Sequence, residues 1–102
     1  MKLFTSPGAE LVKRAALVTG IPHSRLYGTS KTRRTVRTRW AIWMVMRRQG
    51  LSYQEIGDIF GRHYSSVIKA MSSSTRLLTR DSWFKALVNH LASSPLTTET
   101  IP

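Results

Sequence analysis

The chain has 102 residues, of which 41% are hydrophobic, and it contains no cysteine. This length suits one small domain with a single core and is too short for a catalytic domain plus a DNA-binding domain. Without cysteine there can be no disulfide framework and no thiolate metal site. Its 16 Lys and Arg residues against 5 Asp and Glu residues give a net charge of +11. This charge favours a polyanionic partner without choosing between DNA, RNA and an anionic membrane.

The amino-terminal segment lacks the apolar run of a secretory signal, because Thr5, Ser6, Pro7 and Gly8 follow closely on Lys2. No segment approaches the ~18 consecutive apolar residues of a membrane-spanning helix. We therefore expect a cytoplasmic, nucleoid-associated protein.

Apolar residues at helical spacing predict a first helix over residues 9–18, which Gly20 and Pro22 end. Residues 23–27 fit a short helical turn. Residues 28–34 are polar and basic and have no apolar stripe, so we expect an exposed loop there.

A long helix is predicted over residues 36–48, because Val36, Trp40 and Trp43 begin an apolar stripe, and Gly50 ends it. The helical register of the tryptophans favours core packing over base stacking.

The next helix begins with a predicted capping box, formed by Ser52 and Glu55 three residues apart. Its buried stripe includes Ile56 and Phe60. Gly61 then supplies a turn, where a left-handed backbone is easy only for glycine.

Two further helices complete the pattern. One covers residues 65–73, and Asp81 or Ser82 caps the last one, whose apolar residues run from Trp83 to Leu91. Since no strand-like alternation occurs, the predicted fold class is all-α, a compact multi-helix domain with a helix-turn-helix.

The same pattern sets the expected domain limits. Residues 9–92 form one domain, residues 1–8 are a flexible N-terminus, and residues 93–102, with Pro95, three threonines and Pro102, are a disordered tail.

Residues 51–70 have the spacing of a helix-turn-helix. This motif needs a small residue inside its first helix, a glycine at the turn, and apolar residues that clamp both helices against a third. Gly57 is the small residue and Gly61 the turn; since a mid-helix glycine costs about 1 kcal/mol against alanine, close packing explains Gly57. The alternative is a purely structural helical hairpin. The apolar clamp residues are Ile56, Phe60, Val67 and Ala70.

The second helix of the motif is expected to enter the major groove, beginning near Ser65. Its first turn presents His63, Tyr64, Ser65 and Ser66, whose imidazole and hydroxyls can bond base edges or phosphates. Tyr64 could instead contact a thymine methyl or cover the edge of the core. Lys69, one turn later, is the expected phosphate anchor.

A second signal is electrostatic. Between Lys13 and Arg48 there are ten basic residues and no acidic one. Charge of one sign beside a helix-turn-helix can track phosphates, and an arginine can enter a narrow minor groove. The basic residues crowded before and into the long helix are Lys31, Arg33, Arg34, Arg37 and Arg39.

In these residues the chain resembles the C-terminal DNA-binding domain of DnaA, the bacterial replication initiator, a Trp-repressor-like helix-turn-helix protein. The resemblance covers roughly residues 9–92. The segment Leu51-Ser-x-x-Glu-Ile-Gly is similar to the same stretch of that family, and Gly61-Arg62-x-x-Ser-Ser-Val67 is similar to its Gly-Arg-Asp-His-Thr-Thr-Val signature. The segments Ser30-Lys-Thr-Arg-Arg and Arg37-Thr-Arg39 look like its basic loop and the entry of that loop into the long helix.

The resemblance implies that Arg37, with Arg39 beside it, enters the minor groove, and that residues 63–66 contact the major groove. His63 and Tyr64 stand where the family has Asp and His, and serines replace its threonines, so we expect backbone docking to be kept and base preference to change. The complete predicted DNA-contacting set is Lys31, Arg33, Arg34, Arg37, Arg39, Ser52, Tyr53, Gln54, Arg62, His63, Tyr64, Ser65, Ser66 and Lys69.

No Gly-x-x-x-x-Gly-Lys-Ser/Thr loop occurs, so we expect no ATP hydrolysis by the route that initiators of this family use. The three histidines, His23, His63 and His90, lie far apart without paired acids, and we predict no catalytic residue, cofactor or metal.

The functional prediction is a small DNA-binding regulator of transcription or replication, with phage or mobile-element origin as a further hypothesis. The first alternative is a module that binds a host replication or transcription protein. The second is an RNA or membrane binder, although no basic amphipathic helix with a bulky apolar face supports membrane binding. The sequence leaves the oligomeric state open.

Overall fold

The structure is a computed structural model and describes residues 8–93. Within this range the chain forms six α-helices and no strand, which confirms the predicted all-α class. The flexible ends predicted for residues 1–8 and 93–102 lie outside the described residues, apart from Gly8 and Ser93. The helices are α1 (Ala9–Thr19), α2 (His23–Tyr27), α3 (Arg33–Arg48), α4 (Tyr53–Phe60), α5 (Tyr64–Arg80) and α6 (Ser82–Ala92).

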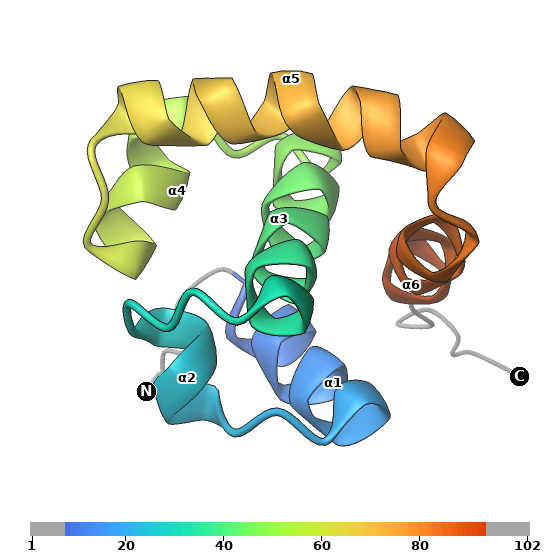
Figure 1. Ribbon diagram of the computed structural model, residues 1–102. Coiled ribbons are helices and arrows are strands. Elements are labelled where there is room, and N and C mark those ends of the chain that lie inside the picture. The colour runs from blue at the N-terminus through green and yellow to red at the C-terminus, as the bar shows by residue number, and fades with distance from the viewer. Residues whose placement is uncertain (1–7, 94–102) are drawn as a thin grey trace, which may run out of the picture.

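Helix α3 is the centre of the fold and contacts each of the other five helices. As Figure 1 shows, α4 and α5 lie near its C-terminal end, α1 and α2 near its N-terminal end, and α6 at its side. All six residues from Ala41 to Met46 are buried as a result. The sequence predicted one apolar stripe on this helix, whereas neighbours on every side bury Trp43 and leave Trp40 half-buried. The predicted core role of these tryptophans is confirmed.

The first turn of α3 differs from the prediction, because the helix begins at Arg33 rather than Val36. Arg33 and Arg34 are exposed and therefore add nothing to the apolar periodicity on which the prediction depended. Thr38 stabilises this first turn of α3. Its side chain is buried, and its hydroxyl donates to the carbonyl of Arg34 at 2.7 Å. Two of the expected loop arginines are thus helical.

Helix α5 is also longer than predicted, since it continues past Ser73 to Arg80. Serine and threonine are weak helix formers, and the run from Ser72 to Thr75 therefore looked like an end. Ser74 is instead fully buried, and Leu77 and Leu78 pack against the core. Tertiary packing outweighs the local propensity and produces a helix of 17 residues.

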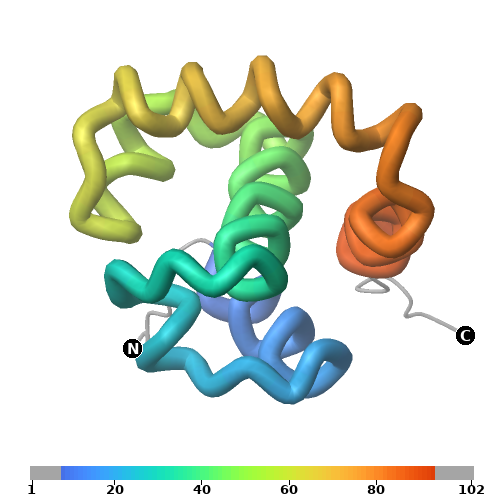
Figure 2. Tube along the Cα trace, in the orientation of Figure 1, coloured from blue at the N-terminus to red at the C-terminus, as the bar shows by residue number. Residues whose placement is uncertain are grey.

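The path of the chain places the helix-turn-helix at one end of the molecule. Figure 2 shows α4 turning sharply into α5, which then crosses the C-terminal end of α3 and leads to α6. Asp81 caps α6 as predicted, because its carboxylate accepts from the amide of Phe84 at 3.1 Å. One surface of α5 therefore packs on the core and the opposite surface faces solvent.

Candidate nucleic-acid interface

The first helix of the motif, α4, starts with the capping box that the sequence predicted. The Ser52 hydroxyl accepts from the amide of Glu55 at 3.0 Å, and the Glu55 carboxylate accepts from the amide of Ser52 at 2.7 Å. Two amides that the helix leaves unpaired are thereby satisfied. This fixes where α4 begins relative to α3.

The crossing of α4 and α5 depends on Gly57. A Cβ at this position would lie 2.5 Å from the carbonyl oxygen of Arg62, and the amide of Arg62 donates to the Gly57 carbonyl at 2.8 Å. Gly61 adopts φ 65°, the left-handed conformation expected of the turn. Both glycine predictions are confirmed, and all four predicted clamp residues are buried: Ile56, Phe60, Val67 and Ala70.

His63 caps α5, which begins at Tyr64, one residue earlier than predicted. The Nδ1 atom of His63 accepts from the amide of Ser65 at 3.1 Å and lies 2.8 Å from the Ser65 hydroxyl oxygen. The imidazole stacks on the Tyr64 ring with centroids 4.5 Å apart. Both side chains are exposed, as are those of Ser66 and Lys69. The first turn of α5 is therefore a preorganised polar surface.

Ile68 belongs to the same surface, and the sequence analysis did not identify it. It is 39% exposed and lies three residues after Ser65 and four after Tyr64, a spacing that puts these side chains on one face of a helix. That spacing was the signal that could have identified it.

The predicted contacts on α4 are partly engaged with neighbours. Tyr53 is half-buried, with the Arg47 guanidinium 4.5 Å from its ring centroid. Gln54 is exposed and donates to the Asp58 carboxylate at 3.1 Å. These side chains, like the Ser52 hydroxyl used in the cap, therefore already have partners within the protein.

Arg39 corrects the predicted set of DNA contacts, because it is only 4% exposed. Its Nε donates to the carbonyl of Leu26 at 2.9 Å, Nη2 to that of Arg25 at 2.9 Å, and both Nη atoms to that of Ser30 at 3.4 Å. Burial, and secondarily the charge of Arg62, lower the pKa of Arg39. Its guanidinium binds the end of α2 and the following connection, so it is not available to DNA.

Arg62 has a related place. It is half-buried, and its Nη2 donates to the carbonyl of Gly28 at 2.6 Å. Because Arg62 directly follows Gly61, this bond ties the turn of the helix-turn-helix to the connection between α2 and α3. Arg39 and Arg62 together set the position of the basic segment relative to α5.

The other basic residues of this region differ in how free they are. Lys31, Arg33 and Arg34 are exposed, and the Arg34 guanidinium lies 4.4 Å from the Trp83 ring centroid. Arg37 forms an ion pair with Asp81, and its side chain is 28% exposed. Of the arginines predicted for the minor groove, Arg37 is thus engaged with an acid and Arg39 is buried.

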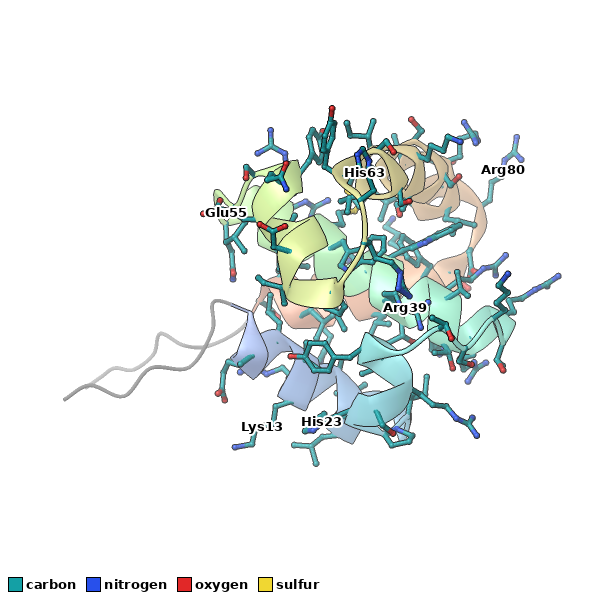
Figure 3. The ribbon with its side chains drawn as sticks, turned by 90° about the vertical axis from the view of Figure 1, so that its left-hand side faces the viewer. Lys13, His23, Arg39, Glu55, His63 and Arg80 are labelled. Carbon is teal, nitrogen blue, oxygen red and sulfur yellow. The ribbon has the colours of Figure 1, made fainter. Side chains whose placement is uncertain are left out.

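A hollow of about 410 Å³ separates the basic connection from the first half of α5. Lys31 and Arg62 line one part of it, Ser66 and Lys69 another, and the Trp40 side chain also contributes. Figure 3 shows His63 near the top of the molecule and Arg39 below it, near the middle of the view. The fold thus brings part of the two predicted sets around one concave surface, with Lys31 and Arg39 from the basic segment and Ser66 and Lys69 from α5. The hollow is not lined by the other predicted residues of these sets, Arg33, Arg34, Arg37, His63, Tyr64 and Ser65.

No helix within residues 8–93 is long and apolar enough to cross a membrane. In the same range, no three side chains of the metal-ligating types form a group that could hold an ion.

Comparison with known proteins identifies the family. No curated protein and no solved structure matches the chain significantly. Residues 9–73 match the family model described as the bacterial dnaA protein helix-turn-helix, which extends from the start of α1 into the middle of α5. The chain therefore belongs to the DnaA helix-turn-helix family and is a DNA-binding helix-turn-helix domain whose partner is double-stranded DNA.

Proposed function

We propose that the protein reads a specific sequence of double-stranded DNA by placing the N-terminal turn of α5 in the major groove. The observation that carries this proposal is the division of α5 into two faces. Val67 and Ala70 are buried against the core, whereas Tyr64, Ser65 and Ser66 are exposed and fixed by the His63 cap. Preorganised polar groups at the start of a recognition helix are what base-edge contact requires.

The chemistry of the exposed face assigns a role to each group. The hydroxyls of Ser65 and Ser66 bond base edges, and Ile68 with the Tyr64 ring meets thymine methyl groups. Lys69 lies one turn further along the helix and contacts a phosphate.

The basic segment supplies the second set of contacts, in the adjacent minor groove and on its phosphates. The exposed Lys31 and Arg33 are better placed for this than Arg37, which would have to exchange Asp81 for DNA. Arg39 acts inside the protein by holding the segment in place.

The biological role that fits such a domain is regulation of transcription or replication at the bound site. A second proposal is docking of a host replication or transcription protein, and Leu17 and Val18 on α1 favour it because they are 79% and 49% exposed. Two apolar side chains are few beside the ~20–30 residues that each partner contributes to a stable interface. DNA reading is the function that the geometry supports best.

The test is selection of bound duplexes from a random library at physiological salt, with Tyr64→Ala and Ser66→Ala as variants. We expect the wild-type protein to enrich one motif and each variant to lose ~1–3 kcal/mol of discrimination at one or two base positions. Ser72→Ala is the matched control, because Ser72 is also exposed on α5 but lies two turns further along.

Two results would contradict the assignment. Equal weakening on all sequences would show that residues 64 and 66 contact phosphates. Absence of any enriched motif, with folded wild-type protein, would show nonspecific binding and leave the protein-docking proposal.

A further inference from the structure

A second basic hollow lies beside the first, on the half of α5 that the sequence analysis did not predict to be helical. Its volume is about 380 Å³, and it is bounded by the start of α3 on one side and the second half of α5 on the other. Five basic side chains line it: Lys31, Arg33, Arg37, Arg76 and Arg80. Arg76 and Arg80 lie beyond residues 9–73, the part that matches the family model.

The charge of this hollow is largely uncompensated. Asp81 pairs with Arg37, and this is the only salt bridge among residues 8–93. The other four basic side chains are exposed and have no acidic partner within the described residues. Four like charges around one concavity repel one another, and an anion bound between them would relieve that repulsion.

The two hollows are continuous. Both are lined by Lys31, Val36, Trp40 and Ser73, so Trp40 lies at their boundary. His63 caps the start of α5 and Arg80 is its last residue, and the lining of the combined trough runs along this helix from Ser66 to Arg80. A trough of this length with basic residues along it fits an extended anion better than a single small one.

Geometry indicates which extended anion it is. At 1.5 Å per residue the 17 residues of α5 span about 25 Å, whereas the major groove is only ~12 Å wide. If α5 enters the groove end-on, by its first turn and at an angle to the groove, its second half leaves the groove and passes over one strand of the backbone. That is where Arg76 and Arg80 lie.

We propose that Arg76 and Arg80, together with Lys31 and Arg33, bind the sugar–phosphate backbone of duplex DNA that flanks the sequence read by the start of α5. This proposal rests on the proposed major-groove docking for its orientation. It extends the contacted DNA beyond the helix-turn-helix without adding base contacts.

The experiment compares the wild-type protein with the double variant Arg76→Gln/Arg80→Gln on the selected duplex, over a range of salt concentrations. Each phosphate contact contributes about −0.9 to the slope of log K against log salt, so loss of two contacts makes the slope shallower by about 1.8. Ethylation interference should disappear at phosphates on one flank, and the selected base motif should not change.

The control is Lys13→Gln/Lys85→Gln, which removes the same charge from exposed residues on α1 and α6 that line neither hollow. It should leave the slope and the interference pattern close to those of the wild-type protein. Because all four positions are exposed, circular dichroism and urea unfolding should confirm that both double variants fold.

The proposal is overturned if the Arg76/Arg80 variant keeps the wild-type slope, if the control variant shows the same change, or if only single-stranded DNA binds more weakly. It also falls if the wild-type protein binds no duplex. If the wild-type protein shows no base preference while the slope difference persists, base reading has failed and the backbone site stands.

Discussion

Two regions meet at the interface, and they use polar residues in opposite ways. In the turn from α4 to α5, the backbone is shaped by Gly57, Gly61 and the His63 cap, and the side chains of Tyr64, Ser65 and Ser66 stay exposed to an external partner. The connection from α2 to α3 has little apolar packing, and hydrogen bonds from two arginine side chains hold it in place. Arg39 donates to the carbonyl of Ser30 and Arg62 to that of Gly28, and Arg39 also binds carbonyls at the end of α2.

The difference shows that a run of basic residues is not one functional unit. Arg33 and Arg39 are six residues apart on the same helix, yet the first is exposed and the second is 4% exposed. Position on the helix relative to α2 decides which guanidinium can reach DNA. The basic segment therefore contains both exposed side chains, which we propose contact DNA, and Arg39, which holds the segment in place.

The largest expected effect on stability comes from removing the Arg39 guanidinium that holds the basic segment in place. Arg39→Ala should lower the free energy of unfolding by about 3 kcal/mol, because three part-buried carbonyls lose their donor and a cavity remains. Arg39→Lys should restore little of it, since one ammonium cannot reproduce the planar fork of a guanidinium. Urea unfolding measures both variants.

Arg48→Ala is the control, because Arg48 is exposed near the end of the same helix. It should change the free energy of unfolding by less than about 0.5 kcal/mol. If Arg39→Ala were as mild as this control, the carbonyl contacts would not hold the connection, and the proposed division of the basic segment would be lost.

A smaller effect is expected at the turn. Gly57→Ala should destabilise the protein by about 2 kcal/mol, because the new methyl group would overlap the carbonyl of Arg62. Helix propensity alone predicts the opposite sign, a gain of about 1 kcal/mol. The sign of the change, measured by urea unfolding, therefore separates close packing from propensity.

Gly61→Asn provides the contrast. Gly61 has open space around its Cβ position and φ 65°, a conformation that asparagine tolerates. We expect a loss well below that of Gly57→Ala. A larger loss at Gly61 would mean that the turn is limited by its backbone conformation and not by the crossing of α4 and α5.

The α4–α5 turn and the α2–α3 connection also differ in how well the sequence predicts them. The turn follows from local rules: the capping box, the two glycines and the exposed residues 63–66 were predicted from their spacing, and the contacts that build the turn are confirmed. These features depend on residues within seven positions of one another. Local chemistry was enough.

The connection and the second half of α5 depend on partners distant in sequence. Arg39 is buried because carbonyls 13 and 14 positions earlier need donors, and charge patterning gives no sign of that. Likewise, α5 continues beyond Ser74 because this residue is buried in the core. The low helix propensity of serine had predicted that the helix would end there. The basic hollow at Arg76 and Arg80 was missed for this reason.

The smallest effect concerns Asp81, which joins α3 to α6. Its carboxylate both caps α6 and pairs with Arg37. Asp81→Ala removes both interactions and should lower the free energy of unfolding by about 1.5 kcal/mol. Asp81→Asn keeps a capping oxygen and should cost only about 0.5 kcal/mol, because a partly exposed ion pair contributes little.

The Asp81→Asn variant also tests whether Arg37 can contact DNA. Asp81→Asn releases Arg37 into the basic hollow, so duplex binding should become tighter and its salt slope steeper by up to about 0.9. Urea unfolding and salt titration of the one variant thus report stability and DNA contact separately. An unchanged slope would show that Arg37 does not reach phosphate even when free, and would leave the exposed arginines and Lys31 as the contacts of this segment.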